Sequence, residues 1–192
     1  MSACYLYVLP LQHEDILKLG ISVDPLTRVR AFAPRWYECF DLARSALVGF
    51  DSVAEARRRE TALHRQLRPW RGAQPLTVPT RAGGHTEWYR GAYAALQEEA
   101  QRDRARGLRV HLPALDWWQR RLQEERPLLF EWGQQCLAGV HEDGLAQSPH
   151  WPGMVDVLDA WPALGVGVED ALPDPLAAAY RRHRDAWRAG LR

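Results

Sequence analysis

The chain has 192 residues, of which 46% are hydrophobic and 10% aromatic, a composition typical of a folded protein with a buried core. The sequence contains no apolar run of about 18 residues, which a membrane span would need, and no basic segment followed by an apolar one, which a secretory signal would need. Its three cysteines are far apart, which argues against a disulfide framework and a cysteine-rich zinc site. We therefore expect a cytoplasmic protein without a membrane partner.

Charge is distributed unevenly between the two halves of the chain. Residues 1–107 contain 16 basic and 12 acidic residues, a net charge of +4, whereas residues 108–192 contain 9 basic and 12 acidic residues, a net charge of −3. A basic front half suits a polyanionic partner. We predict two domains, 1–107 and 108–192. The second is an all-helical, Trp-rich accessory domain, for which protein binding and self-association are the candidate roles.

Two short runs at residues 4–9 and 16–21 are rich in Tyr, Val, Leu and Ile, and they predict a β-hairpin. Successive side chains of a strand point to opposite faces, so Tyr7 and Lys18 lie on the faces away from the plainly apolar positions. Lys18 is the only lysine among the 25 basic residues. It is either a solvated strand residue or a position that requires a compact ammonium group.

A helix is expected to follow the hairpin, because Asp24 and Pro25 form a typical helix start. Arg28 and Arg30 lie beside its apolar stripe, and either is a solvated helix charge or a phosphate contact. A third strand is predicted within residues 41–50, after a loop with exposed aromatic residues.

The next helix is marked by a capping box that begins at Ser52. The spacing of its apolar residues places Glu60 on the buried face. A buried carboxylate is costly unless it is paired or bound to a cation. One interpretation pairs Glu60 with one of the arginines at positions 57–59. The other makes it a metal ligand with His64 one turn away as its neighbour.

Residues 69–84 are rich in Pro, Gly and Thr, which predicts a loop. Arg71 and Arg81 in this loop are candidates for contact with a nucleic-acid backbone, and an ordinary surface loop is the alternative. Glu87 follows the loop and either orients a site residue or caps the next helix. The two aromatic residues after it are expected to pack in the core.

These features resemble the GIY-YIG nuclease superfamily over about residues 4–90. Residues 5–7 look like the first motif, with Tyr7 as its tyrosine. Residues 18–20 look like the second motif, with Lys18 where many members have tyrosine. Glu60 falls where the superfamily has its metal-binding glutamate. The Glu60–His64 pair and residues 84–89 resemble a phage and bacterial sub-branch that also carries lysine in the second motif.

The resemblance implies an α/β (α+β) fold: a small three-stranded antiparallel sheet flanked by helices, followed here by the all-helical C-terminal domain. It also implies an endonuclease, a hydrolase that cleaves phosphodiester bonds of nucleic acid, with DNA expected in preference to RNA. One divalent ion, Mg²⁺ or Mn²⁺, would be held by Glu60.

The catalytic residues implied by the resemblance are Tyr7, Lys18, Arg28, Glu60 and His64. Arg28 would contact the phosphate. Tyr7 would orient or deprotonate the attacking water, and deprotonation requires a nearby cation, such as Lys18, to lower the pKa of the phenol. His64 is a second candidate for proton transfer.

The nucleic-acid-binding residues are expected to be Arg28, Arg30, Arg71 and Arg81. One alternative function is a catalytically inactive nucleic-acid- or protein-binding module on the same scaffold. Another is an α/β domain joined to a helical scaffold for a protein partner.

Overall fold

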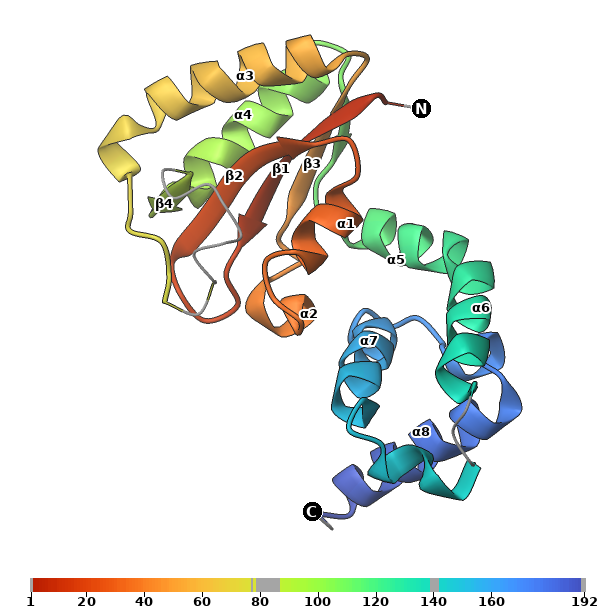
Figure 1. Cartoon of the computed structure of the whole chain (residues 1–192). Coiled ribbons are helices and arrows are strands. Elements are labelled where there is room, and N and C mark those ends of the chain that lie inside the picture. Colours follow the sequence, from red (N-terminus) through yellow and green to blue (C-terminus); the bar gives the residue numbers. More distant parts are fainter. Residues whose placement is uncertain (1, 77, 79–86, 139–141, 191–192) are drawn as a thin grey trace. The chain divides into compact units, whose positions relative to one another are not determined.

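The computed structural model describes residues 2–76, 78, 87–138 and 142–190 (Figure 1). The chain divides into two compact units, Met1–Trp118 and Gln119–Arg192. Among the described residues, every helix is too short or too polar to cross a membrane.

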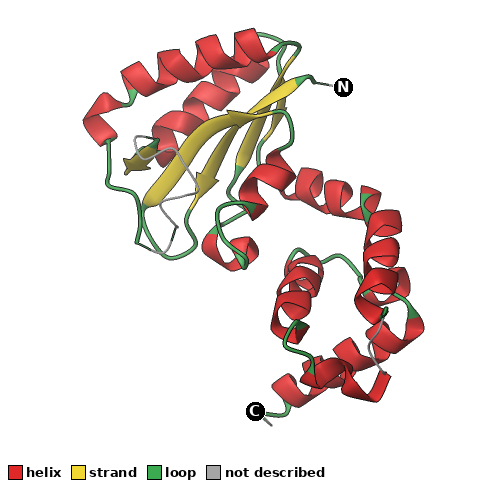
Figure 2. Ribbon diagram, viewed as in Figure 1, coloured by secondary structure: helices red, strands yellow, loops and turns green. Residues whose placement is uncertain are grey.

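The first unit is built on one antiparallel sheet of five strands in the order β4-β2-β1-β3-β5 (Figure 2). The strands are β1 (Cys4–Pro10), β2 (Ile16–Ser22), β3 (Ala46–Phe50), β4 (Trp88–Arg90) and β5 (Arg109–His111). The α+β class and the β1–β2 hairpin are confirmed. The prediction of three strands is wrong, because β4 and β5 add a short strand at each edge. A run of three residues is too short to give the alternating pattern on which the prediction depended.

The segment from residue 108 onward was expected to be entirely helical, but it begins with β5. This strand pairs with β3 through Val110 and its neighbours. The third predicted strand is also shorter than expected and starts only at Ala46. Ahead of it a short helix, α2 (Trp36–Cys39), lies in the expected loop.

Local capping positions the helices of the first unit. Helix α1 (Pro25–Arg30) starts where Asp24 accepts hydrogen bonds from the backbone N–H groups of the first turn, as predicted. Helix α3 (Val53–Gln66) starts at Ser52, whose hydroxyl accepts from the Glu55 N–H. The remaining elements of this unit are the 3₁₀ turn η1 (Arg68–Trp70) and helix α4 (Tyr93–Ala105).

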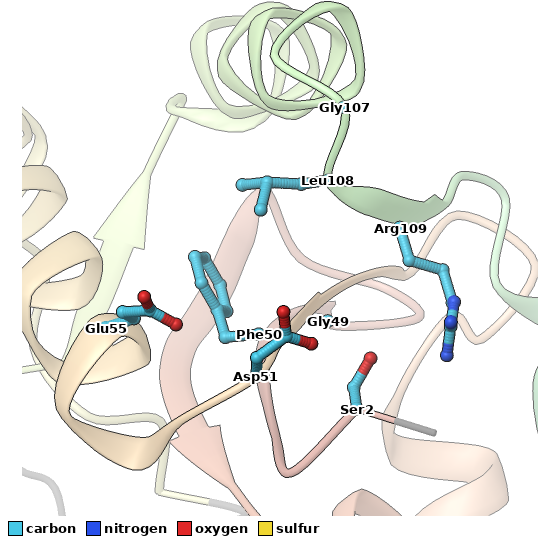
Figure 3. Close-up of a pocket in the computed structure, with 8 residues that line it drawn as sticks. All are labelled: Ser2, Gly49, Phe50, Asp51, Glu55, Gly107, Leu108 and Arg109. Carbon is cyan, nitrogen blue, oxygen red and sulfur yellow. The ribbon is translucent and has the colours of Figure 1, made fainter.

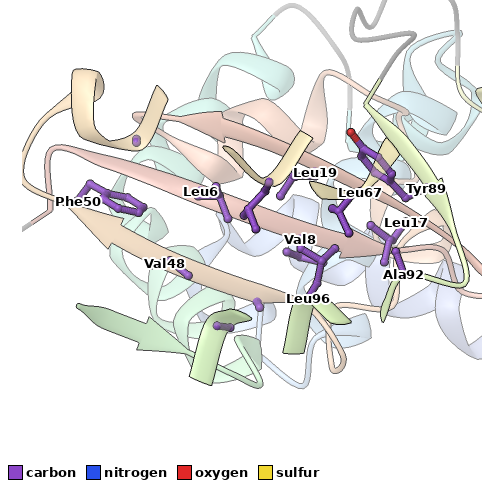
Figure 4. Packing of buried hydrophobic residues seen from close by; sticks show 14 of the residues in the cluster. Leu6, Val8, Leu17, Leu19, Val48, Phe50, Leu67, Tyr89, Ala92 and Leu96 are labelled. Atoms are coloured by element: carbon purple, nitrogen blue, oxygen red, sulfur yellow. The ribbon is translucent and has the colours of Figure 1, made fainter. Parts of the chain in front are cut away.

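Helices α3 and α4 cover one face of the sheet, and α1 lies on the other side (Figure 1). The core between the sheet and the two long helices is aliphatic. Figure 4 shows Leu6, Val8 and Leu19 of the strands packed with Leu67 and Leu96 from the helical layer. These side chains are 3% exposed or less, so they hold α3 firmly against the sheet.

The opposite face of the sheet is aromatic. Tyr7 lies edge-on to Phe32, and Phe32 lies edge-on to Phe40, with ring centroids 6.4 and 5.7 Å apart. In the β1–β2 register Tyr7 is opposite Gly20 and Leu9 is opposite Lys18. The two motif residues Tyr7 and Lys18 therefore share this face, as the alternation of the strands predicted.

The second unit is helical. Its elements are the end of α5 (Leu115–Glu124), α6 (Arg126–Leu137), η3 (Glu142–Gln147), α7 (Trp151–Ala163), η4 (Glu169–Ala171) and α8 (Asp174–Arg188). Pro127 in the first turn of α6 separates that helix from α5, as expected of a residue that cannot continue a helix. Trp161 and Tyr180 are fully buried, and the Tyr180 hydroxyl donates to Asp159 at 2.7 Å.

Candidate metal and nucleic-acid site

The candidate site forms at the edge of β2, where the short strand β4 begins. Strand β4 pairs with Ile16–Lys18 of β2, and just beyond this pairing the Leu19 N–H donates to the Glu87 carbonyl at 3.1 Å. Glu87 is thereby held at the edge between the aromatic face and the α3 face. Side chains from both faces of the sheet can meet there.

Lys18 is fully buried and forms an ion pair with Glu87, with 3.0 Å between Nζ and Oε2. Its ammonium group also lies over the rings of Phe32 and Trp88, 5.1 and 4.8 Å from their centroids. Burial lowers the pKa of Lys18, and the Glu87 carboxylate acts in the opposite direction. The interpretation of Lys18 as a solvated strand residue is therefore wrong.

Glu60 lies on the buried face of α3, as its position in the apolar pattern predicted, and is 3% exposed. Its Oε2 accepts a hydrogen bond from Arg57 Nη1 at 2.9 Å, one turn earlier. Its Oε1 lies 3.8 Å from His64 Nε2, one turn later. Both interpretations of this carboxylate thus have a structural basis: it has an arginine partner, and it has a histidine neighbour.

His64 is held by Tyr89, a contact that the sequence did not predict. The Tyr89 hydroxyl lies 2.5 Å from His64 Nδ1, and the two rings stack with centroids 5.9 Å apart. Burial raises the pKa of Tyr89, whereas the charge and hydrogen bond of Arg71 lower it. Tyr89 is a core residue, as expected, but its polar end belongs to the site. Two signals in the sequence could have revealed it: the short spacing from Glu87 to Tyr89 and the resemblance of residues 84–89 to the sub-branch motif.

Glu60, His64 and Glu87 can together hold a metal ion. Each offers one ligand atom, and these atoms lie within 4.8 Å of one another. Two carboxylates and one imidazole are a donor set that suits a divalent cation such as Mn²⁺ or Mg²⁺. The residues present therefore fit the ion implied by the sequence. Glu87 is a member of this group, although the sequence predicted only that it orients a site residue or caps a helix.

Tyr7 approaches the second motif so closely that position 20 has no room for a side chain. A Cβ at Gly20 would lie 2.4 Å from the Tyr7 hydroxyl oxygen. Burial raises the pKa of Tyr7 to about 12, although a hydrogen bond and the charge of Arg28 oppose the rise. Arg28 is thus a nearby cation that lowers this pKa, but desolvation outweighs its effect. The Tyr7 phenol is therefore protonated at neutral pH.

Arg28 lies in the last turn of α1, half-buried beside Tyr7, with its guanidinium carbon 4.8 Å from the centroid of Phe32. Arg30 is also half-buried on α1. Arg71 is exposed and bridges to Tyr89. Arg81 lies outside the described residues. The structure thus brings Tyr7, Lys18, Arg28, Glu60, His64 and Arg71 to one region.

A separate cavity of about 530 Å³ lies near the start of α3 (Figure 3). Its lining includes Ser2, Asp51, Glu55 and Arg109, and the predicted site residues are not part of this lining. Its two carboxylates and single guanidinium are ordinary surface charges, so the cluster at the β2 edge is the candidate site.

A family model described as the T5orf172 domain matches residues 4–104, more than half of the chain. No curated protein and no solved structure matches the chain. The match is compatible with a nuclease-like or nucleic-acid-binding role. It spans all the candidate site residues, from Tyr7 to Tyr89.

Proposed function

The chain belongs to the T5orf172 domain family, and on that basis we propose that its first unit is a divalent-metal-dependent endonuclease that hydrolyses phosphodiester bonds, with DNA as the expected substrate. The observation that carries the proposal is that His64, Glu87 and the buried Glu60 each place one possible ligand atom within 4.8 Å of the other two. The resemblance of the hairpin to the GIY-YIG motifs supports the same activity.

Each residue of the cluster has a distinct part in the proposed reaction. Glu60 would hold the ion, and a bound divalent cation supplies charge neutralisation for the phosphate and the leaving oxygen. Arg28 would bind a non-bridging phosphate oxygen through its planar guanidinium. Tyr7, with its pKa near 12, would orient water through its phenol and would not act as a base at neutral pH.

Proton transfer falls to His64 in this proposal. His64 is only partly exposed, and Tyr89 fixes its ring at Nδ1, so Nε2 is directed to the Glu60 side of the cluster. Imidazole is the side chain most often used for proton transfer in active sites. The exposed Arg71 would contact the nucleic-acid backbone beside it.

The test is cleavage of plasmid DNA, single-stranded DNA and RNA in the presence of Mg²⁺, Mn²⁺ or EDTA. We expect metal-dependent cutting by the wild type and a loss of at least about 1,000-fold in Glu60→Gln, because a catalytic cation contributes several kcal/mol. Glu98→Gln is the matched control, since Glu98 is an exposed carboxylate on α4. Undiminished cutting by folded Glu60→Gln would overturn the proposal.

A non-enzymatic nucleic-acid-binding module is the second candidate. It is favoured by the Arg57–Glu60 ion pair, which gives the buried carboxylate a partner without a metal. A folded wild type that binds DNA with strong salt dependence but cuts no substrate under any of these conditions would support this alternative.

A further inference from the structure

We propose that Glu60, His64 and Glu87 form a three-donor site that selects Mn²⁺ over Mg²⁺, and that Arg57 competes with the ion for Glu60. The inference deepens the proposed function, because it shares Glu60 with it, but it concerns ion binding by the free protein. It adds two ligands to the single carboxylate, and His64, which binds the ion through Nε2, takes this role in place of proton transfer. It also assigns separate roles to the two cationic side chains of the cluster.

The distances fit a shared ion. Two donors bound to one ion at about 2.1 Å lie about 3.0 Å apart at neighbouring positions and about 4.2 Å apart at opposite ones. Glu60 Oε1 and His64 Nε2 are 3.8 Å apart, within this range. The spread of 4.8 Å over all three donors requires only a small movement. Glu87 can supply it, since its side chain is 26% exposed.

The two cations of the cluster differ in their freedom to move. Lys18 is fully buried and holds Oε2 of Glu87, which leaves the other oxygen of that carboxylate for an ion. We therefore assign Lys18 as a positioning residue for Glu87. Arg57 holds Oε2 of Glu60, but its side chain is 65% exposed. Arg57 can leave toward solvent or a phosphate group when an ion arrives, whereas Lys18 cannot.

The ligand types decide the ion. Mg²⁺ prefers oxygen ligands and keeps much of its water, whereas first-row transition ions accept imidazole nitrogen readily. One imidazole beside two carboxylates therefore favours Mn²⁺. Tyr89 supports the assignment, because a hydrogen bond to the second ring nitrogen is the usual way in which a metal-binding histidine is oriented.

The experiment is titration of the full chain with Mn²⁺ and with Mg²⁺. Calorimetry measures the binding of both ions, and electron paramagnetic resonance measures the binding of Mn²⁺. We expect one Mn²⁺ per chain, bound more tightly than Mg²⁺. His64→Gln and Glu87→Gln should each weaken Mn²⁺ binding about tenfold or more. The nitrogen modulation of the Mn²⁺ signal should disappear in His64→Gln. His13→Gln and Glu98→Gln, at exposed positions, are the matched controls.

Arg57→Gln gives the most discriminating result, because it should tighten Mn²⁺ binding several-fold by removing the competitor. If Arg57 and Glu60 form only a structural ion pair, the same change leaves the affinity where it was. Arg57 is exposed, so this variant is expected to fold. Thermal unfolding followed by circular dichroism checks that every variant is folded.

Unchanged Mn²⁺ affinity in folded Arg57→Gln overturns the competition between Arg57 and the ion, and two results overturn the three-donor site. One is a wild type without Mn²⁺ binding at millimolar concentration, and the other is unchanged Mn²⁺ affinity in folded His64→Gln and Glu87→Gln. If cleavage requires Glu60 but Mn²⁺ binding does not require His64 or Glu87, the proposed nuclease stands and the three-donor site is overturned. If Mn²⁺ binding requires all three donors but no substrate is cleaved, the three-donor site stands and the proposed nuclease is overturned.

Discussion

Two neighbouring residues of α3 lead to two different clusters of buried charge. Arg59 faces α4, where it donates to Glu99 at 2.8 Å and to Asp103 at 2.9 Å. Glu60 faces the β2 edge and accepts from Arg57. Glu99 and Asp103 are 5% and 1% exposed, so they are as buried as Glu60.

The comparison teaches that burial of a carboxylate does not by itself mark a functional site. In the α4 cluster both carboxylates share Arg59, which is mostly buried and therefore fixed. Gln66 also donates to Glu99, and the exposed Arg102 and Arg106 add outer ion pairs. In the β2-edge cluster the countercharge of Glu60 is largely exposed, and a histidine lies beside it. A fixed and complete cluster stabilises the fold, whereas one with a displaceable partner can bind an ion.

The largest expected effect on stability lies in the α4 cluster. Arg59→Ala should lower the free energy of unfolding by about 3 kcal/mol, because it leaves two buried carboxylates without their main partner. Urea unfolding measures the change, with the exposed Arg58→Ala as control. If both variants lose the same small amount, the distinction between a structural and a functional cluster fails.

A smaller loss is expected on the side of the candidate site. Gly20→Ala should cost about 2 kcal/mol, because the new Cβ meets the Tyr7 hydroxyl and the ring must move. Gly153→Ala is the control, since a Cβ there meets no atom within 4 Å. Chemical denaturation compares the two variants. A Gly20→Ala protein as stable as the wild type would show that Tyr7 is not held tightly.

Acid should weaken the α4 cluster. Burial raises the pKa of Glu99, but hydrogen bonds from Arg59 and Gln66 and nearby guanidinium charges outweigh it, so the pKa lies below its ordinary value of 4.5. The stabilisation is therefore present above pH 4.5 and is lost as pH falls through the lowered pKa of the folded state.

In Arg59→Ala the ionised form of Glu99 loses this support, so the stability difference between wild type and Arg59→Ala should shrink below pH 4.5. Urea unfolding at pH 7, 5, 4 and 3 measures this trend. A difference that stays constant over the series would show that Glu99 does not carry the effect.

The smallest effect on stability is expected for Arg57→Gln, which should stay within about 0.5 kcal/mol of the wild type. Glu60 is buried, but its partner Arg57 is 65% exposed, so solvent screens most of their interaction and the pair contributes little. Thermal unfolding in the presence of EDTA gives this value free of any bound ion. A loss as large as that of Arg59→Ala would place Glu60 in the same structural class as Glu99.

Features that depend on neighbouring residues could be predicted from the sequence. The alternation of the hairpin placed Tyr7 and Lys18 on one face of the sheet. The capping box and helical spacing placed Glu60 on the buried face of α3 beside His64. These predictions hold because strand alternation, helix periodicity and capping act within a few residues.

Which groups meet depends on contacts between distant parts of the chain. The partner of Lys18 is Glu87, 69 residues away, and His64 meets Tyr89 across 25 residues. The rise in the pKa of Tyr7 also comes from burial among distant elements. Edge strands of three residues bring these groups together, and such strands form through pairing with the sheet, not through their own sequence. Contacts between distant residues depend on the packing of the whole unit, and a local pattern does not specify that packing.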